Sequence, residues 1–126
     1  MIWLPMVDGD HKGWALRYLR EAKAELIAAE KMPYLALGLI LEALRKAQGA
    51  IYHSLGEPAF VRAIVHENMG EDSLGDPILS FLVEIERTVQ RVAQLPNSRH
   101  EDVMKEASVI IKLASDVVRL FTGETA

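Results

Sequence analysis

The sequence predicts an all-α protein, an antiparallel up-and-down four-helix bundle with one short extra helix. Ala, Leu, Val and Ile supply most of the apolar side chains, and aromatic residues make up only 6% of the 126-residue chain. That composition favours packed helices over a β-sandwich. Apolar residues recur at steps of three and four in five segments, and no alternating apolar–polar stretch is long enough to predict a strand. The length predicts a single domain over residues 1–126.

The first two predicted helices span residues 12–31 and 33–55. Asp10 is the expected N-cap of the first helix, Pro33 lies in the first turn of the second, and Gly56 ends the second. The first helix places its apolar residues on one face: Trp14, Ala15, Tyr18, Ala22, Leu26 and Ala29.

The second helix begins with YLALGLILEAL, which is apolar all round. We therefore expect other helices to surround it, with Gly38 and Ala43 allowing a neighbour to approach closely. A short third helix is predicted over residues 58–69, where Gly70 closes it.

Local start signals mark the last two predicted helices. Asp76 is an N-cap for a helix that begins at Pro77, and Pro96 breaks the chain after it. Ser98 and Glu101 then predict a capping box, in which each side chain satisfies a free backbone N–H. The helix after Asp76 carries one apolar stripe: Ile78, Leu82, Ile85, Val89 and Val92.

The last predicted helix carries two apolar stripes. The first comprises Val103, Ala107, Ile110, Ala114, Val117 and Phe121. The second comprises Val109, Leu113 and Leu120. One stripe buries a helix in its own bundle, so the second needs another partner. Two arrangements supply one: helices of the same chain on both sides, or a two-fold symmetric homodimer.

Charge and composition set the expected partners and compartment. The net charge of −4 and the pI of about 5.5 argue against DNA, because phosphate binding needs Lys and Arg concentrated on one face. The absence of cysteine fits a reducing cytoplasm. The opening MIWLPMVDGD lacks the basic residues of a signal peptide, and no apolar run is long enough to span a membrane. We expect a soluble cytoplasmic protein, with an N-terminal arm at residues 1–9, either flexible or packed on the bundle, and a C-terminal tail at 123–126.

No residue pattern predicts a metal or a cofactor. Di-iron bundles place a Glu three residues before a His. The residues at that spacing here are Asp8, Ala50, Ala63 and Asn97. His66-Glu67 begins like a zinc-protease helix, but the second His would fall at Gly70. There is also no Gly-rich phosphate loop.

Two helical faces carry the candidate site residues. Arg62 and His66 lie four positions apart, hence on one face of the third helix, where they are a candidate catalytic pair. Basic chains beside rings suit a phosphate or a base. Such a set lies along the second helix: Arg45, Lys46, Tyr52 and His53. The alternative for both faces is a solvated surface, with an ion pair between Glu42 and Lys46.

Parts of the first two helices and of the last helix resemble a known protein family. The stretch GWALRYLREAKAELIAAEKMPYLALGLILEALRKAQGAIYHSLG resembles the first two helices of HEPN domains, the higher eukaryotes and prokaryotes nucleotide-binding domains. The likeness lies in an Ala-rich first helix, a short break, and a second helix with Ala43, Arg45, Lys46 and Ala47 before a Gly. The ending SRHEDVMKEASVIIKLASDVVRLF is similar to the family's last helix. The resemblance implies a homodimeric four-helix bundle that acts on nucleotides or RNA, as a ribonuclease toxin or as a noncatalytic partner of a nucleotidyltransferase.

The ribonuclease members of that family carry Arg, four to six residues, and then His. Arg62 and His66 have three residues between them, and no other Arg–His pair fits. The sequence therefore favours a noncatalytic, HEPN-like dimer that binds a nucleotide, RNA or a partner protein. Two alternatives stay open. One is a divergent metal-independent ribonuclease that uses Arg62 and His66, and the other is a plain interaction or assembly module without a small ligand.

Overall fold

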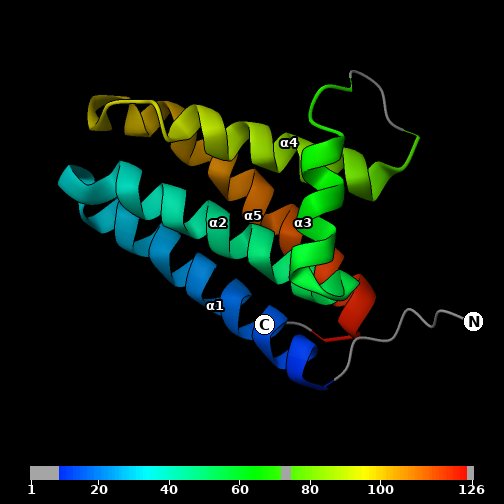
Figure 1. The fold of residues 1–126 in the computed structure, drawn as a ribbon. Coiled ribbons are helices and arrows are strands. Elements are labelled where there is room, and N and C mark those ends of the chain that lie inside the picture. Colours follow the sequence, from blue (N-terminus) through cyan, green and yellow to red (C-terminus); the bar gives the residue numbers. More distant parts are fainter. Residues whose placement is uncertain (1–8, 72–74, 125–126) are drawn as a thin grey trace, which may run out of the picture.

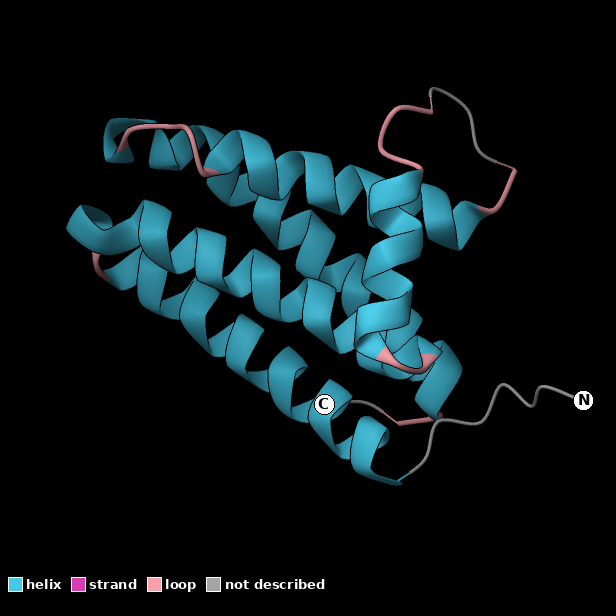
Figure 2. Ribbon diagram, in the orientation of Figure 1, coloured by secondary structure: helices cyan, strands magenta, loops and turns pink. Residues whose placement is uncertain are grey.

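The computed structural model describes residues 9–71 and 75–124, and every regular element in these ranges is a helix (Figure 2). The all-α prediction is therefore confirmed. The α-helices are α1 (Gly9–Lys31), α2 (Ala36–Leu55), α3 (Pro58–Glu67), α4 (Pro77–Val92) and α5 (His100–Thr122). Two single-turn 3₁₀ helices, η1 (Pro33–Leu35) and η2 (Asn97–Arg99), precede α2 and α5. Residues 1–8 of the expected N-terminal arm lie outside the described residues, whereas Gly9 belongs to α1.

Helix α2 is the centre of the fold, because α1, α3, α4 and α5 all pack against it. α1 and α2 form a long hairpin, α5 runs behind them, and α4 lies beside α2 (Figure 1). The short α3 runs across α2 and α4 at one end of the molecule (Figure 1). Within the described residues, no helix is long and apolar enough to cross a membrane.

Small side chains bring α1 and α2 together. Fully buried alanines lie along both helices: Ala15, Ala22, Ala29, Ala36, Ala43, Ala47 and Ala50. Small residues at a contact let helix axes come close. The predicted stripe of α1 is confirmed except at its start, where Trp14 is 43% exposed and Leu19 is buried instead.

The prediction that other helices surround the second helix is confirmed for α2, but it fails for the two residues before it. Tyr34 and Leu35 are 73% and 50% exposed, because they lie in η1 before the chain enters the core. At Gly38, no neighbouring atom of the described residues lies within 4 Å of the place a Cβ would occupy, so this glycine allows no close approach. That role belongs to Gly49, where the Tyr18 ring comes within 3.4 Å of the corresponding position.

The predicted start and buried stripe of α4 are confirmed. The Asp76 carboxylate accepts hydrogen bonds from the backbone N–H groups of Ile78 at 2.8 Å and Leu79 at 3.1 Å. The stripe is buried from Leu82 onward: Leu82, Ile85, Val89 and Val92. α3 buries less of its surface than α4 does, since Val65 is its one fully buried side chain.

The predicted capping box at the start of α5 is wrong. Ser98 lies inside η2, and α5 has no side-chain cap. The turn of η2 carries the chain into α5 instead, with the backbone N–H groups of Arg99 and His100 donating to the carbonyls of Pro96 and Asn97. Asp10 was expected before the first helix, yet it lies inside the first turn of α1.

The second apolar stripe of α5 is exposed. Val109, Leu113 and Leu120 are 52%, 44% and 72% accessible to solvent. α5 packs on α2 and α1 with the opposite side of the helix. Of the two arrangements that the sequence left open, burial of this stripe by helices of the same chain is therefore wrong. The homodimer stays a prediction.

Candidate functional site

A groove lies between α2, α3 and α4, and it consists of two adjoining hollows. The α4-side hollow has a volume of about 640 Å³ and is lined by Arg45, Gln48, Arg62, His66, Glu86, Val89, Gln90, Ala93 and Gln94. The α1-side hollow has a volume of about 360 Å³ and is lined by Tyr18, Glu42, Arg45, Lys46, Gly49, Tyr52, His53, Pro58 and Arg62. Arg45 and Arg62 line both, so we treat the two as one site and call it the α2–α3 groove.

The groove brings together all six site residues named from the sequence. Arg45 and Arg62 come from different helices, and α3 places the Arg62 guanidinium 6.0 Å from the centroid of the Tyr52 ring. Sequence spacing predicted two separate helical faces. Sequence spacing alone could not predict that the two faces line one groove, because this depends on how α3 crosses α2.

Neither Arg45 nor Arg62 forms an ion pair with a carboxylate among the described residues. Five other arginines do: Arg17, Arg87, Arg91, Arg99 and Arg119. Both groove arginines are also exposed. Their charge is thus available to an anion, and a guanidinium binds phosphate oxygens through two parallel N–H groups.

Tyr52 lies beneath these arginines and is only 2% exposed. Its hydroxyl is buried and, within the described residues, forms no hydrogen bond of good geometry, although the Gln48 side chain is close enough to interact with it and to lower its pKa slightly. Burial raises the pKa of Tyr52 to about 12; the Glu86 carboxylate adds to the increase and Arg62 opposes it. At neutral pH the group is therefore a neutral hydroxyl with a donor to offer.

Lys46 has a different environment from the two arginines. Its ammonium contacts Glu21 at 3.0 Å, Glu42 at 3.7 Å and also Glu25. The hydrogen bonds that Lys46 donates to Glu25 and then Glu21 raise the pKa of Lys46, while burial raises the pKa of Glu25. The pKa of Glu21 is lowered by its hydrogen bonds to Lys46 and Arg17. With three carboxylates around it, Lys46 has a structural role in joining α1 to α2, and we assign it no ligand.

Glu86 is a groove residue that the sequence did not single out. Its Oε1 accepts a 2.6 Å hydrogen bond from Gln48 Nε2, and its Oε2 accepts a 2.9 Å bond from Gln90 Nε2. His66 Nε2 lies 3.9 Å from the same Oε2. Gln48 is buried in α2 although it is polar, and only the packing of α4 explains its partner. The amides hold this carboxylate in a defined position within the α4-side hollow.

Rings gather at the opposite end of the groove. The His53 ring centroid lies 5.4 Å from that of His11, 5.6 Å from Tyr18 and 6.3 Å from Trp14. Its Nδ1 is buried and has no hydrogen-bond partner among the described residues. Burial, with a further contribution from His11, lowers the pKa of His53. Trp14 is 43% exposed, and the Arg17 guanidinium lies over its ring, 5.1 Å from the centroid.

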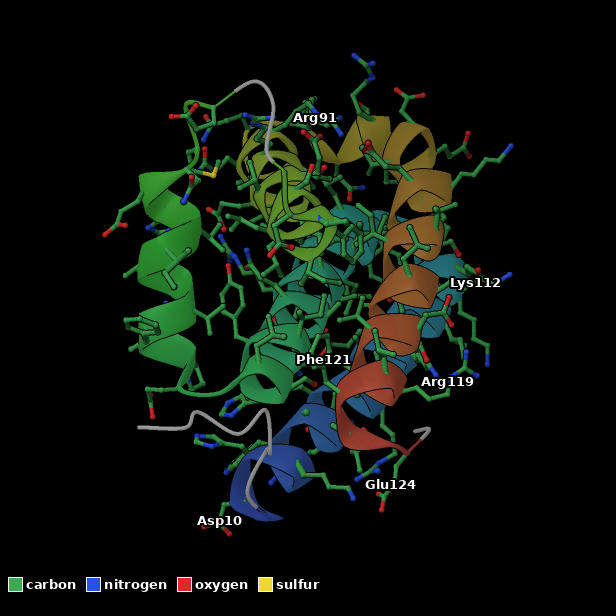
Figure 3. The ribbon with its side chains drawn as sticks, turned by 90° about the vertical axis from the view of Figure 1, so that its right-hand side faces the viewer. Asp10, Arg91, Lys112, Arg119, Phe121 and Glu124 are labelled. Atoms are coloured by element: carbon green, nitrogen blue, oxygen red, sulfur yellow. The ribbon has the colours of Figure 1, made fainter. Side chains whose placement is uncertain are left out.

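A third hollow, which we call the apolar hollow, lies between α3, α4 and α5 and has a volume of about 540 Å³. Leu55, Phe60, Val61, Ile64, Ile78, Leu79, Leu82 and Phe121 line most of it. Phe60 is 67% exposed. In Figure 3, Phe121 lies between α3 and the α5 side chains Lys112 and Arg119, which extend into solvent.

Among the described residues, no group of three or more His, Asp or Glu side chains is arranged to hold a metal ion. Comparison with protein-family models finds no family that matches the chain, and comparison with curated proteins and with solved structures finds no match either. The case for a function therefore depends on the groove itself.

Proposed function

We propose that the protein is a noncatalytic, HEPN-like helical module that binds a nucleotide or an RNA strand in the α2–α3 groove. The observation that carries this proposal is the pair of exposed arginines, Arg45 and Arg62, which have no carboxylate partner in the described part of the chain and line both hollows. An overall negative charge does not prevent phosphate binding where two guanidinium groups converge.

The rest of the groove fits such a ligand. The Tyr52 ring lies in the lining of the α1-side hollow, where the Arg62 guanidinium is 6.0 Å from its centroid and is held on the groove side of α2. The volumes of the hollows, about 640 and 360 Å³, are in the range of small-ligand sites. Unpaired bases stack on aromatic rings, and Tyr18 supplies a ring in the lining of the α1-side hollow.

The architecture in this proposal is the up-and-down four-helix bundle implied by the HEPN resemblance. α1, α2, α4 and α5 would be its four helices and α3 the short extra one. The exposed row of Val109, Leu113 and Leu120 would pair with the same row of a second copy, because a two-fold interface is self-complementary.

Arg62 and His66 are assigned to binding rather than to cleavage. They are separated by three residues, where the ribonucleases of the resembling family have four to six. If the protein is instead a divergent ribonuclease, purified wild-type protein will cleave RNA without metal and His66→Ala will abolish the cleavage. Intact RNA after long incubation with the wild type removes that alternative.

The binding proposal is tested with a fluorescein-labelled oligoribonucleotide and measurements of fluorescence anisotropy. Arg45→Ala and Arg62→Ala should each weaken binding by about tenfold or more, since each removes a charge-assisted phosphate contact. Arg20→Ala is the matched control, because Arg20 is an exposed arginine on α1 outside the groove. Binding that all three variants retain, or that the wild type lacks, contradicts the proposal.

The apolar hollow favours a second candidate function, a binding site for a partner protein such as a nucleotidyltransferase. Its lining is mostly apolar, with Glu57 and Asp76 as its acidic residues, and Phe60 in that lining is exposed. In this case Phe60→Ser would abolish co-purification of a specific partner, while Arg62→Ala would leave it unchanged.

A further inference from the structure

Glu86 is the acidic residue in the lining of the α4-side hollow, and its side chain is 14% exposed. Each of its oxygens accepts one hydrogen bond from a glutamine amide, Gln48 on one side and Gln90 on the other. A carboxylate oxygen has two lone pairs. One acceptor site on each oxygen therefore remains, on a group that the amides hold fixed within the groove.

The Glu86 carboxylate limits which part of a ligand can lie next to it in the groove. The phosphate belongs near Arg45 and Arg62, because a phosphate close to Glu86 would meet a like charge. The part of the ligand near Glu86 must instead donate hydrogen bonds. The sugar of a ribonucleotide does so, since its hydroxyl groups are donors, and a carboxylate bonded to a ribose hydroxyl is a known solution in nucleotide-binding proteins.

We propose that the groove is selective for ribonucleotides over deoxyribonucleotides, with Glu86 accepting a hydrogen bond from the ribose 2′-hydroxyl while Arg45 and Arg62 hold the phosphate. This inference rests on the nucleotide or RNA binding proposed above. Gln48 and Gln90 act as positioning residues, since they touch Glu86 and keep its oxygens in place. The selectivity arises from the partly buried carboxylate, which loses its donor when the 2′-hydroxyl is missing.

The test compares two labelled oligonucleotides of about six residues, oligoadenylate and oligodeoxyadenylate, at one fixed salt concentration. They have the same bases and the same number of phosphates, so the ratio of their affinities reports the sugar alone. The wild type should bind the ribo form about tenfold more tightly, as expected for one hydrogen bond to a charged acceptor. Glu86→Gln should bring the ratio close to one, whatever happens to the absolute affinities.

Glu84→Gln is the matched control, since Glu84 lies on the same helix but faces solvent, where it pairs with Arg87. It should keep the wild-type ratio. Circular dichroism of each variant shows whether α-helix content is unchanged. The wild-type ratio also tests the inference without any variant.

The outcomes separate this inference from the proposed function. If the wild type binds both oligonucleotides equally, the groove binds nucleic acid but the proposed sugar selectivity is wrong. If a ribo preference persists in Glu86→Gln, another residue recognises the sugar and the assignment to Glu86 is wrong. If neither oligonucleotide binds, the proposed function fails, and this inference fails with it.

Discussion

The side-chain oxygen of Asn97 accepts a 2.9 Å hydrogen bond from the backbone N–H of Leu37, a residue 60 positions earlier in the chain. The Asn97 amide nitrogen also donates a 3.0 Å bond to the Pro33 carbonyl. α2 has no side-chain cap of its own. Asn97 therefore satisfies a backbone group in the first turn of the central helix and fixes the α4–α5 connection against it.

We expect Asn97→Ala to lower the free energy of unfolding by about 1–2 kcal/mol, the usual effect of removing a helix cap. Urea denaturation followed by circular dichroism measures this. Ser98→Ala is the control, because Ser98 is the residue that the sequence marked as a cap and the structure leaves in η2. Its effect should stay within about 0.5 kcal/mol. A larger effect at Ser98 than at Asn97 would contradict the structure.

Tyr52→Phe should change the free energy of unfolding by less than about 1 kcal/mol, because the buried hydroxyl that it removes has only an interaction of poor geometry with Gln48 among the described residues. Ser54→Ala is the contrasting change: its hydroxyl is also buried, but it donates to the Ala50 carbonyl at 2.8 Å. A marked loss of stability in Tyr52→Phe would mean that the hydroxyl does have a partner.

Lys46→Met leaves Glu21, Glu25 and Glu42 without their shared cation, and we expect it to lower the free energy of unfolding by about 2 kcal/mol near neutral pH. The three carboxylates repel one another only when they are ionised. The loss of unfolding free energy in Lys46→Met should therefore become smaller as the pH falls to about 4. Since the pKa of Glu25 is raised, the folded chain holds that proton to a higher pH than the unfolded chain does. This group therefore favours folding more on the acidic side of its pKa.

Thermal melts of the wild type and Lys46→Met at the two pH values check this expectation. Lys112→Met is the control, since Lys112 is exposed on α5 (Figure 3) and should give no pH-dependent deficit. If Lys46→Met loses the same stability at both pH values, the loss does not come from repulsion among the three carboxylates.

His53 should make the protein less stable in mild acid. Its pKa is lowered by burial in the folded chain, so the unfolded chain takes up the proton first as the pH falls below about 6.5. The stability contributed by the neutral ring is complete above that pH and is lost as the pH falls through the folded pKa. His53→Gln should therefore have a flatter profile of melting temperature between pH about 7.5 and about 5. An unchanged profile would assign the acid sensitivity to other groups.

Leu113→Glu tests the proposed dimer. If two copies meet through Val109, Leu113 and Leu120, a charge at Leu113 should yield a folded monomer, because burying an unpaired carboxylate is unfavourable. Light scattering gives the mass, and circular dichroism confirms the helix content. Ser108→Glu, an exposed position on the α1 side of α5, should leave the mass unchanged. A wild-type protein that is already monomeric contradicts the dimer.

The sequence predicts well the features that depend on neighbours along the chain. The Asp76 cap and the stripe from Leu82 to Val92 follow from local chemistry and helical period, and both are present. Features that depend on contacts between distant segments were not predictable. Neither the hydrogen bond from the Leu37 N–H to Asn97 nor that from Gln48 to Glu86 has a local signal, because the partners are 60 and 38 positions apart.

The groove follows the same rule. Its residue types were recognised on α2 and α3 separately, as basic and aromatic side chains at helical spacing. The sequence could not predict that Arg45 and Arg62 line the same hollows, because this depends on how α3 crosses α2. Lys46 shows the opposite case: sequence spacing suggested Glu42 as its partner, but Glu21 and Glu25 from α1 complete its environment.

α3 forms one side of the groove, and Val65 is its one fully buried side chain. Beyond the apolar contacts, the Arg87 guanidinium fixes the chain after α3 by donating to the carbonyls of Met69 and Glu71. A short element with so little buried surface opens locally at a lower free energy than the whole domain unfolds. The groove therefore exists only in the fraction of molecules in which α3 is docked, and the apparent affinity for any ligand is reduced by that fraction. By the same equilibrium, a bound ligand stabilises the docked position of α3.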